Sequence, residues 1–150
     1  MTTAEKYMKI AIELAKEAAE NDEVPVGAIV VKNGEIIAKA FNQKETQNCA
    51  TRHAEIIALE NASKAVGNWW LEDCELFVTL EPCTMCAGAM VLSRIEKLYF
   101  GAYDEKTGAV GSVTNVLEQK SNHKIEYEGG VLQDECSKLL SDFFKAKRKN

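Results

Sequence analysis

Three residues of this chain have the types and spacing of metal ligands, and a carboxylate lies beside them. Glu55 follows His53 by two residues, and Cys83 and Cys86 form a Cys-x-x-Cys pair directly after Pro82. One imidazole and two thiolates would fill three of the four tetrahedral positions that Zn²⁺ prefers. The fourth position would stay open for water, which is typical of a catalytic zinc rather than a structural one.

The chemistry expected of such a group is hydrolytic deamination. Zinc lowers the pKa of its bound water, so that a zinc-bound hydroxide can attack an amidine-like carbon such as C6 of adenine. Glu55 is not needed as a ligand, and we expect it to carry protons to the ring and to the leaving ammonia. His-x-Glu followed by Pro-Cys-x-x-Cys is a known signature of zinc nucleobase deaminases.

Other interpretations of these residues stay open. An ordinary histidine and a redox-active Cys-x-x-Cys pair would need no metal. Cys49 lies four residues before His53, and together with Cys83 and Cys86 it would complete a closed Cys₃His structural site. A zinc-stabilised binding module without catalysis is the remaining alternative. Neither a closed site nor a binding module would give Glu55 a role beside the metal.

Length and charge restrict the class of protein. The 150 residues suit one domain with one core, which we expect to span residues 1–150. A net charge of −5 argues against a protein that coats nucleic acid by bulk attraction. It leaves room for a local basic surface, and such a cluster stands near the C-terminus: Lys145, Lys147, Arg148 and Lys149.

Cysteine usage and the N-terminal segment indicate the compartment. Five cysteines without regular spacing do not make a disulfide framework. Residues 4–20 carry four glutamates and no apolar core of a signal peptide, and no apolar run has the length of a membrane span. We therefore expect a cytoplasmic protein that does not associate with a membrane.

The hydrophobic pattern predicts the elements that must position these residues. Strands alternating with helices indicate a layered α/β domain. Helices are expected over residues 4–20, 53–66, 84–93 and 133–147, and strands over residues 26–31, 36–41, 76–80, 98–100 and 125–127. Asn33-Gly34 predicts a tight hairpin between the first two strands. His53 and Cys83 then fall at helix starts, where the partial positive charge favours thiolates. In the last helix, Leu139, Leu140, Phe143 and Phe144 are expected to face inward.

At these residues the chain resembles the cytidine-deaminase-like superfamily, and within it the bacterial tRNA-specific adenosine deaminases. The resemblance covers nearly the whole length. It rests on these segments: Glu23-Val-Pro-Val-Gly-Ala28, His53-Ala-Glu55, Val78-Thr-Leu-Glu-Pro-Cys-Thr-Met-Cys-Ala-Gly-Ala89, Ser93-Arg94-Ile95, Phe100-Gly-Ala102, Lys106-Thr-Gly-Ala109, Gly111-Ser112 and Leu140-Ser-Asp-Phe-Phe144. The Lys-Thr-Gly-Ala segment and the Phe-Phe pair before a basic tail point to the tRNA branch.

The resemblance implies a three-layer α/β/α fold with a mixed five-stranded sheet. It implies a homodimer with one Zn²⁺ per subunit and no organic cofactor. The implied activity is conversion of adenosine to inosine at the wobble position of tRNA, with the anticodon stem-loop as partner. The alternative is a deaminase of a free nucleobase or nucleotide, of the guanine, cytosine or CMP type.

Particular substrate-binding residues follow from the same resemblance. Asn42 would hydrogen-bond the base, Val26 would belong to an apolar wall, and Asp104 and Lys106 would contact the anticodon strand. The full expected set is Asn42, Val26, Ala54, Asp104, Lys106, Lys145 and Arg148. Arg52 departs from the small residue that the family commonly has before the histidine.

Overall fold

Five strands form one mixed sheet in the spatial order β2-β1-β3-β4-β5. The structure is a computed structural model, and it describes residues 1–148. β1 pairs antiparallel with both β2 and β3, whereas β3, β4 and β5 run parallel to one another. The strands are β1 (Gly27–Lys32), β2 (Glu35–Phe41), β3 (Cys74–Leu80), β4 (Lys97–Ala102) and β5 (Glu126–Glu128).

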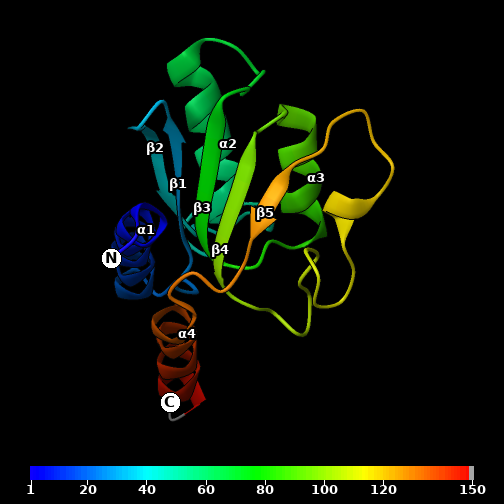
Figure 1. Cartoon of the computed structure of the whole chain (residues 1–150). Helices are drawn as coiled ribbons and strands as arrows, with labels where there is room; N and C mark the ends of the chain where they lie inside the picture. Colours follow the sequence, from blue (N-terminus) through cyan, green and yellow to red (C-terminus); the bar gives the residue numbers. More distant parts are fainter. Residues whose placement is uncertain (149–150) are drawn as a thin grey trace.

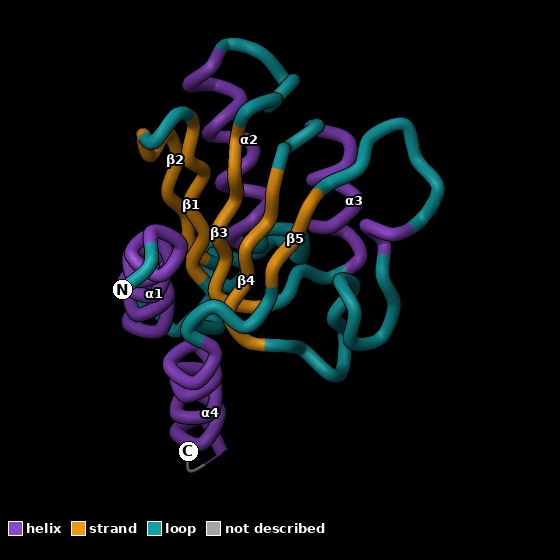
Figure 2. Tube along the Cα trace, in the orientation of Figure 1, coloured by secondary structure: helices purple, strands orange, loops and turns teal. Residues whose placement is uncertain are grey.

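Four helices cover the two faces of this sheet (Figures 1 and 2). Helices α1 (Thr3–Glu20) and α4 (Gln133–Arg148) pack on one face, and α2 (Ala54–Val66) and α3 (Thr84–Ser93) pack on the other. The alternation along β1 produces the two layers: Ile29 and Val31 pack with α1, while Ala28 and Val30 pack with α2 and α3. The expected three-layer architecture with a mixed five-stranded sheet is confirmed.

The hairpin between β1 and β2 follows the sequence signal. Asn33 and Gly34 both have positive φ, 52° and 80°, as the tight turn that suits two twisted strands requires. All nine predicted helices and strands occur, with ends that differ from the expected ones by two residues at most. A short 3₁₀-helix at Val116–Glu118 has no periodic pattern to predict it.

One prediction about the last helix is wrong in part. Leu139, Leu140 and Phe143 are half-buried, but the side chain of Phe144 is 43% exposed instead of facing the core. The cause is the length of α4, whose C-terminal half extends past the end of the sheet (Figure 1). The two phenylalanines therefore meet a cavity rather than the sheet face.

The topology gathers several chain segments at one end of the sheet. The segment after β3 leads through Glu81 and Pro82 into α3, and the segment after β2 leads through residues 42–53 into α2. The start of α2 and the start of α3 therefore lie close together. None of the helices in residues 1–148 has the length and apolarity that crossing a membrane requires.

Candidate active site

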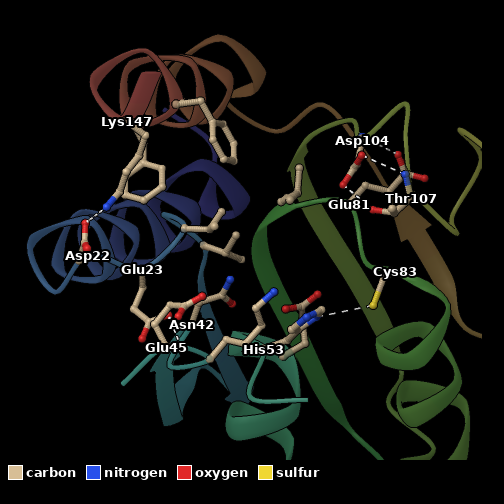
Figure 3. A pocket seen from close by; sticks show the side chains of 17 residues that line it. Asp22, Glu23, Asn42, Glu45, His53, Glu81, Cys83, Asp104, Thr107 and Lys147 are labelled. Atoms are coloured by element: carbon tan, nitrogen blue, oxygen red, sulfur yellow. Dashed lines mark hydrogen bonds and ion pairs between the residues drawn. The ribbon is translucent and has the colours of Figure 1, made fainter. Parts of the chain in front are cut away.

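His53 and Cys83 occupy equivalent places at the starts of two neighbouring helices. His53 is the N-cap of α2 and Cys83 is the N-cap of α3, and both have extended backbone conformations. Neither side chain caps its own helix. Both side chains are therefore free to point toward each other across the gap between the helices (Figure 3).

The three predicted ligands form one compact group, which we call the metal cluster: His53, Cys83 and Cys86. Their ligand atoms all lie within 4.8 Å of one another. The Nδ1 atom of His53 is 3.6 Å from Sγ of Cys83 and 3.5 Å from Sγ of Cys86. A tetrahedral zinc with its usual bond lengths would separate nitrogen and sulfur by about 3.6 Å. The donor types and their spacing therefore fit a zinc ion.

The electrostatics of the metal cluster favour ligand formation at Cys83. A hydrogen bond from Cys86 lowers the pKa of the Cys83 thiol to about 4. The same hydrogen bond, together with burial, raises the pKa of Cys86, and the hydrogen bond with Cys83 raises the pKa of His53. The three groups thus compete for protons in a small space, and a divalent cation would relieve that competition.

Glu55 lies in the first turn of α2, two residues after the predicted ligand His53. Its side chain is buried, yet it lines the same cavity as His53 and Cys83. Burial raises the pKa of the Glu55 carboxyl to about 7. A carboxyl with that pKa can both accept and donate a proton near neutral pH, as a general acid and base must.

Cys49 does not take part in this group. Among residues 1–148, the ligand group consists of His53, Cys83 and Cys86 alone. Sγ of Cys49 instead lies 3.5 Å from the hydroxyl of Thr51. The geometry therefore gives no support to a closed Cys₃His site.

A cavity of about 590 Å³ opens above the metal cluster (Figure 3). Several segments that lie far apart in the sequence contribute to its walls. The lining residues are Asp22, Glu23, Val24, Val26, Asn42, Lys44, Glu45, His53, Glu55, Leu80, Glu81, Cys83, Asp104, Thr107, Phe143, Phe144 and Lys147. The volume is in the range of small-molecule sites.

Three of the expected substrate-binding residues line this cavity: Val26, Asn42 and Asp104. The side-chain oxygen of Asn42 accepts a hydrogen bond of 2.8 Å from the backbone N–H of Ala54, the first residue of α2. Within the described residues, the Asn42 amide NH₂ has no protein partner. Ala54 is fully buried and acts here only through its backbone.

The remaining expected contact residues, apart from Ala54, are surface lysines and an arginine. Lys106, Lys145 and Arg148 are exposed and are not part of the cavity wall. Lys147 reaches the cavity and forms an ion pair with Asp22 (Figure 3). We call Asp22, Phe143, Phe144 and Lys147 the rim. Lys149, the other basic residue noted in the sequence, lies outside the described residues.

Asp104 uses its carboxylate within its own loop. Oδ1 accepts hydrogen bonds from the backbone N–H groups of Lys106 and Thr107, and Oδ2 accepts one from the Thr107 hydroxyl. This is an Asx-type turn, which fixes the loop after β4. Asp104 therefore shapes the cavity wall, whatever contact it makes with a ligand.

Two buried glutamates of the cavity wall, Glu23 and Glu81, were missed by the sequence reasoning. Each stands next to apolar residues and near a proline, in Glu23-Val-Pro25 and Glu81-Pro82. For Glu81, which directly follows the apolar strand β3, a carboxylate in that place was an available signal. Glu23 follows Asn21 and Asp22, so nothing local marked it as buried. Arg52, which departs from the family pattern, pairs with Glu60 on α2 at 2.8 Å.

Comparisons with known proteins agree with this geometry. The MafB19-like deaminase family matches residues 2–148. A tRNA-specific adenosine deaminase of Bacillus subtilis (strain 168) is 53% identical over 150 residues, which cover 99% of this chain and 93% of that protein. The tRNA-specific adenosine deaminase of Aquifex aeolicus (strain VF5) is 51% identical over 147 residues, which cover 97% of each chain.

A solved structure gives the same result for the fold. It comes from work on A-to-I editing by tRNA:A34 deaminases at the wobble position of transfer RNA. It superposes with a TM-score of 0.87 at 40% identity, and the match covers 90% of this chain and 99% of that one. The fold of this chain is therefore that of a deaminase.

Proposed function

This chain belongs to the family of tRNA-specific adenosine deaminases, and from that premise we propose that its cavity converts adenosine at the wobble position of tRNA to inosine. The reaction consumes one water and releases one ammonia. The observation that carries the proposal is the metal cluster with buried Glu55 beside it, at the base of a cavity large enough for a purine nucleotide. The whole chain would act as one deaminase domain.

Each residue of the site has a chemical role in this proposal. One zinc ion, held by His53, Cys83 and Cys86, would supply a Lewis acid that activates water at neutral pH. Glu55 accepts the proton that water loses and delivers protons to ring N1 and to the leaving amine. Its pKa of about 7 suits both directions of transfer.

Asn42 is the residue we propose to orient the base. Because its oxygen is occupied by the N–H of Ala54, its NH₂ group is left as a donor to an acceptor on the purine edge. Val26, which is buried in the cavity wall, would provide an apolar contact for the ring.

Recognition of the RNA strand requires residues outside the cavity. The target base cannot reach the metal cluster from inside a stacked loop, so the nucleotide must be extruded. We propose that Asp104 and Lys106 contact the anticodon strand beside that nucleotide, and that Lys145 and Arg148 bind its phosphates. No organic cofactor is needed because water is the only co-reactant. The tRNA substrate and the five free cysteines suit the cytoplasm.

A second copy of the chain is the partner we propose for an apolar groove between α2 and α3. The groove is lined by residues of both helices and by Trp69: Ile56, Leu59, Ser63, Trp69, Ala89, Leu92 and their neighbours. Leu92 is 72% exposed and Trp69 is 62% exposed, which is costly for large apolar side chains facing water. Small residues of α3 would permit close packing of a homodimer there.

Light scattering with size-exclusion chromatography tests the homodimer. We expect a dimeric mass at micromolar concentration for the unaltered chain and a monomeric mass for Leu92→Asp. Lys39→Asp, a charge change at an exposed residue of β2, is the control and should stay dimeric. A monomeric mass for the unaltered chain would refute this part of the proposal.

One substrate panel tests the proposed function itself. The zinc-loaded protein is incubated with an adenosine-containing anticodon stem-loop and, separately, with free cytosine, guanine and adenosine. We expect inosine in the stem-loop and little product from the free compounds. Efficient turnover of free cytosine or guanine without inosine in the stem-loop would instead assign the chain to nucleobase deaminases.

A further inference from the structure

Two buried carboxylates in the cavity wall have no role in the proposed deamination. Glu23 is 1% exposed and Glu81 is 2% exposed. Within residues 1–148, neither forms a salt bridge with a cation. Burying a charge without a partner costs free energy. Each of these two carboxylates must therefore accept hydrogen bonds from specific groups of the protein.

Glu81 is satisfied by the loop that follows β4. Its Oε1 accepts hydrogen bonds from the backbone N–H of Asp104 at 3.0 Å and from the hydroxyl of Ser112. Its Oε2 accepts hydrogen bonds from the backbone N–H groups of Val110 at 2.9 Å and of Ser112 at 3.1 Å. All four partners are donors, which matches a carboxylate that can only accept.

The same loop wraps around the Glu81 carboxylate closely. A Cβ at position 108 would collide with Cδ of Glu81 and with the backbone oxygen of Asp104. Glycine is therefore the residue that lets the chain pass at this distance. The loop from residue 103 to residue 112 is thus held by Glu81, a side chain outside it, in addition to the turn that Asp104 forms within it.

Glu23 likewise holds the loop on the other side of the cavity through hydrogen bonds. Its Oε1 accepts a hydrogen bond of 3.0 Å from the backbone N–H of Glu45. Its Oε2 accepts hydrogen bonds from the backbone N–H and the hydroxyl of Thr46, at 2.5 Å and 2.7 Å. Burial raises the pKa of the Glu23 carboxyl, but the hydrogen bonds from Thr46 and its neighbours outweigh burial and lower the pKa overall.

The loop held by Glu23 and the loop held by Glu81 face each other across the metal cluster. The loop bound by Glu23 contributes Lys44 and Glu45 to the cavity wall, and the loop bound by Glu81 contributes Asp104 and Thr107. Figure 3 shows Glu23 beside Glu45 on one side and Glu81 beside Asp104 and Thr107 on the other. The distance between these loops decides how wide the entrance is for a nucleotide strand.

We propose that Glu23 and Glu81 are positioning residues that hold the two opposite walls of the cavity at the separation a polynucleotide strand requires. They act on the binding of the strand and not on proton transfer at the base. The inference rests on the proposed function, because it takes the occupant to be RNA. It goes beyond that function by assigning strand entry to two buried side chains that touch neither metal nor base.

The test compares Glu23→Gln and Glu81→Gln in the zinc-loaded protein with the unaltered chain. Glutamine keeps the size of the side chain but places an NH₂ donor against backbone donors. With such a hydrogen bond unmade, we expect KM for the stem-loop to rise about tenfold for each variant, and kcat to stay within about threefold. Glu135→Gln, an exposed carboxylate paired with Lys9, is the control and should change neither value.

Two smaller changes keep the test decisive if a glutamine variant does not fold. Thr46→Val and Ser112→Ala each remove one hydroxyl donor and leave the backbone hydrogen bonds in place. We expect KM to rise by about threefold in each, less than in the glutamine variants, with kcat unchanged. Zinc content per chain, measured by elemental analysis, should stay equal in all variants.

Amide hydrogen exchange provides a readout that does not depend on activity. Faster exchange is expected at Glu45 and Thr46 in Glu23→Gln, and at Asp104, Val110 and Ser112 in Glu81→Gln. If the unaltered chain forms no inosine, the proposed function fails, and hydrogen exchange still tests the hold on the loops. Unchanged exchange at these amides, or a fall in kcat at constant KM, would overturn the inference.

Discussion

The metal cluster and the rim are two parts of one cavity, and they are built in opposite ways. The metal cluster comes from the starts of two packed helices, and Cys86 at its centre is fully buried. The rim comes from the end of α4 and the turn after α1, where the Asp22 side chain is 73% exposed and that of Lys147 is 45% exposed. Fixed geometry suits bond making, whereas exposed charge suits reversible binding of a strand.

The largest difference between the two parts should appear on metal removal. Chelation should abolish inosine formation, because no rim residue can replace a Lewis acid. It should also lower the unfolding temperature, because a ligand at a thousand times its Kd stabilises the folded state by about 4 kcal/mol. Calorimetry with and without added zinc measures this shift.

The rim variant Lys147→Ala is the matched comparison for metal removal. It should show the same zinc-dependent shift as the unaltered chain, since Lys147 lies in α4 and away from the metal cluster. If zinc does not raise the unfolding temperature of Lys147→Ala, the contrast between the metal cluster and the rim is wrong.

Glu55→Gln should have the next largest effect. The amide keeps the shape of the side chain but cannot relay protons, so the single-turnover rate should fall by about 10²–10⁴-fold. Zinc content and substrate affinity should remain. Glu13→Gln, an exposed carboxylate on α1, is the control with an unchanged rate. Near-normal turnover in the Glu55 variant would remove its role as proton carrier.

The contrast between the metal cluster and the rim also explains which features the sequence could predict. The metal cluster and the neighbouring Glu55 were predicted because His53, Glu55, Cys83 and Cys86 are placed by local spacing at helix starts. The strands and helices were predicted because apolar residues recur with the period of each element. Local patterns therefore determine the part of the site where we propose that the chemistry takes place.

The rim and the cavity walls depend on contacts between distant segments. Phe144 was expected in the core because its helix is amphipathic, but nothing local shows that α4 extends past the sheet. Glu23 and Glu81 are defined by loops that begin about 20 residues later, and by which donors those loops present. Such contacts have no periodic signature in a single sequence.

Asn42 lies in the cavity between the metal cluster and the rim. Two variants of this residue can separate its effect on stability from its effect on the binding of the base. Asn42→Ala removes the acceptor for the Ala54 N–H, which should destabilise the fold by about 1 kcal/mol, and it also removes the donor to the base. Asn42→Asp keeps the acceptor and loses only the donor. Catalytic efficiency should fall by about 10- to 100-fold in both, because a hydrogen bond to the base is left unmade.

Chemical denaturation combined with steady-state kinetics measures both effects. The alanine variant should lose stability and efficiency, and the aspartate variant should lose efficiency alone. Equal efficiency of the aspartate variant and the unaltered chain would show that the NH₂ group does not meet the base.

Removing residues 145–150 should affect the rim and leave the metal cluster intact. Each single-strand phosphate contact contributes about −0.7 to the slope of log affinity against log salt. Loss of Lys145, Lys147 and Arg148 should flatten this slope by that amount for every contact they make. Zinc content and kcat should not change. In a chain with a net charge of −5, an unaltered slope would show that the phosphates bind elsewhere.

The smallest expected effect concerns the ion pair at the rim. Lys147 is paired with Asp22, so a phosphate has to displace a carboxylate before it can use this cation. Exposed pairs of this kind contribute at most about 1 kcal/mol, which limits the gain from freeing Lys147 to about fivefold in KM. Asp22→Asn should therefore lower KM for the stem-loop by a factor below that limit, with kcat unchanged. It should also steepen the salt dependence, because Lys147 becomes available to the strand.

In Lys147→Ala the Asp22→Asn change should have a smaller effect, since only the general loss of a negative charge remains. If Asp22→Asn lowers KM equally in both backgrounds, the pair does not hold Lys147 back.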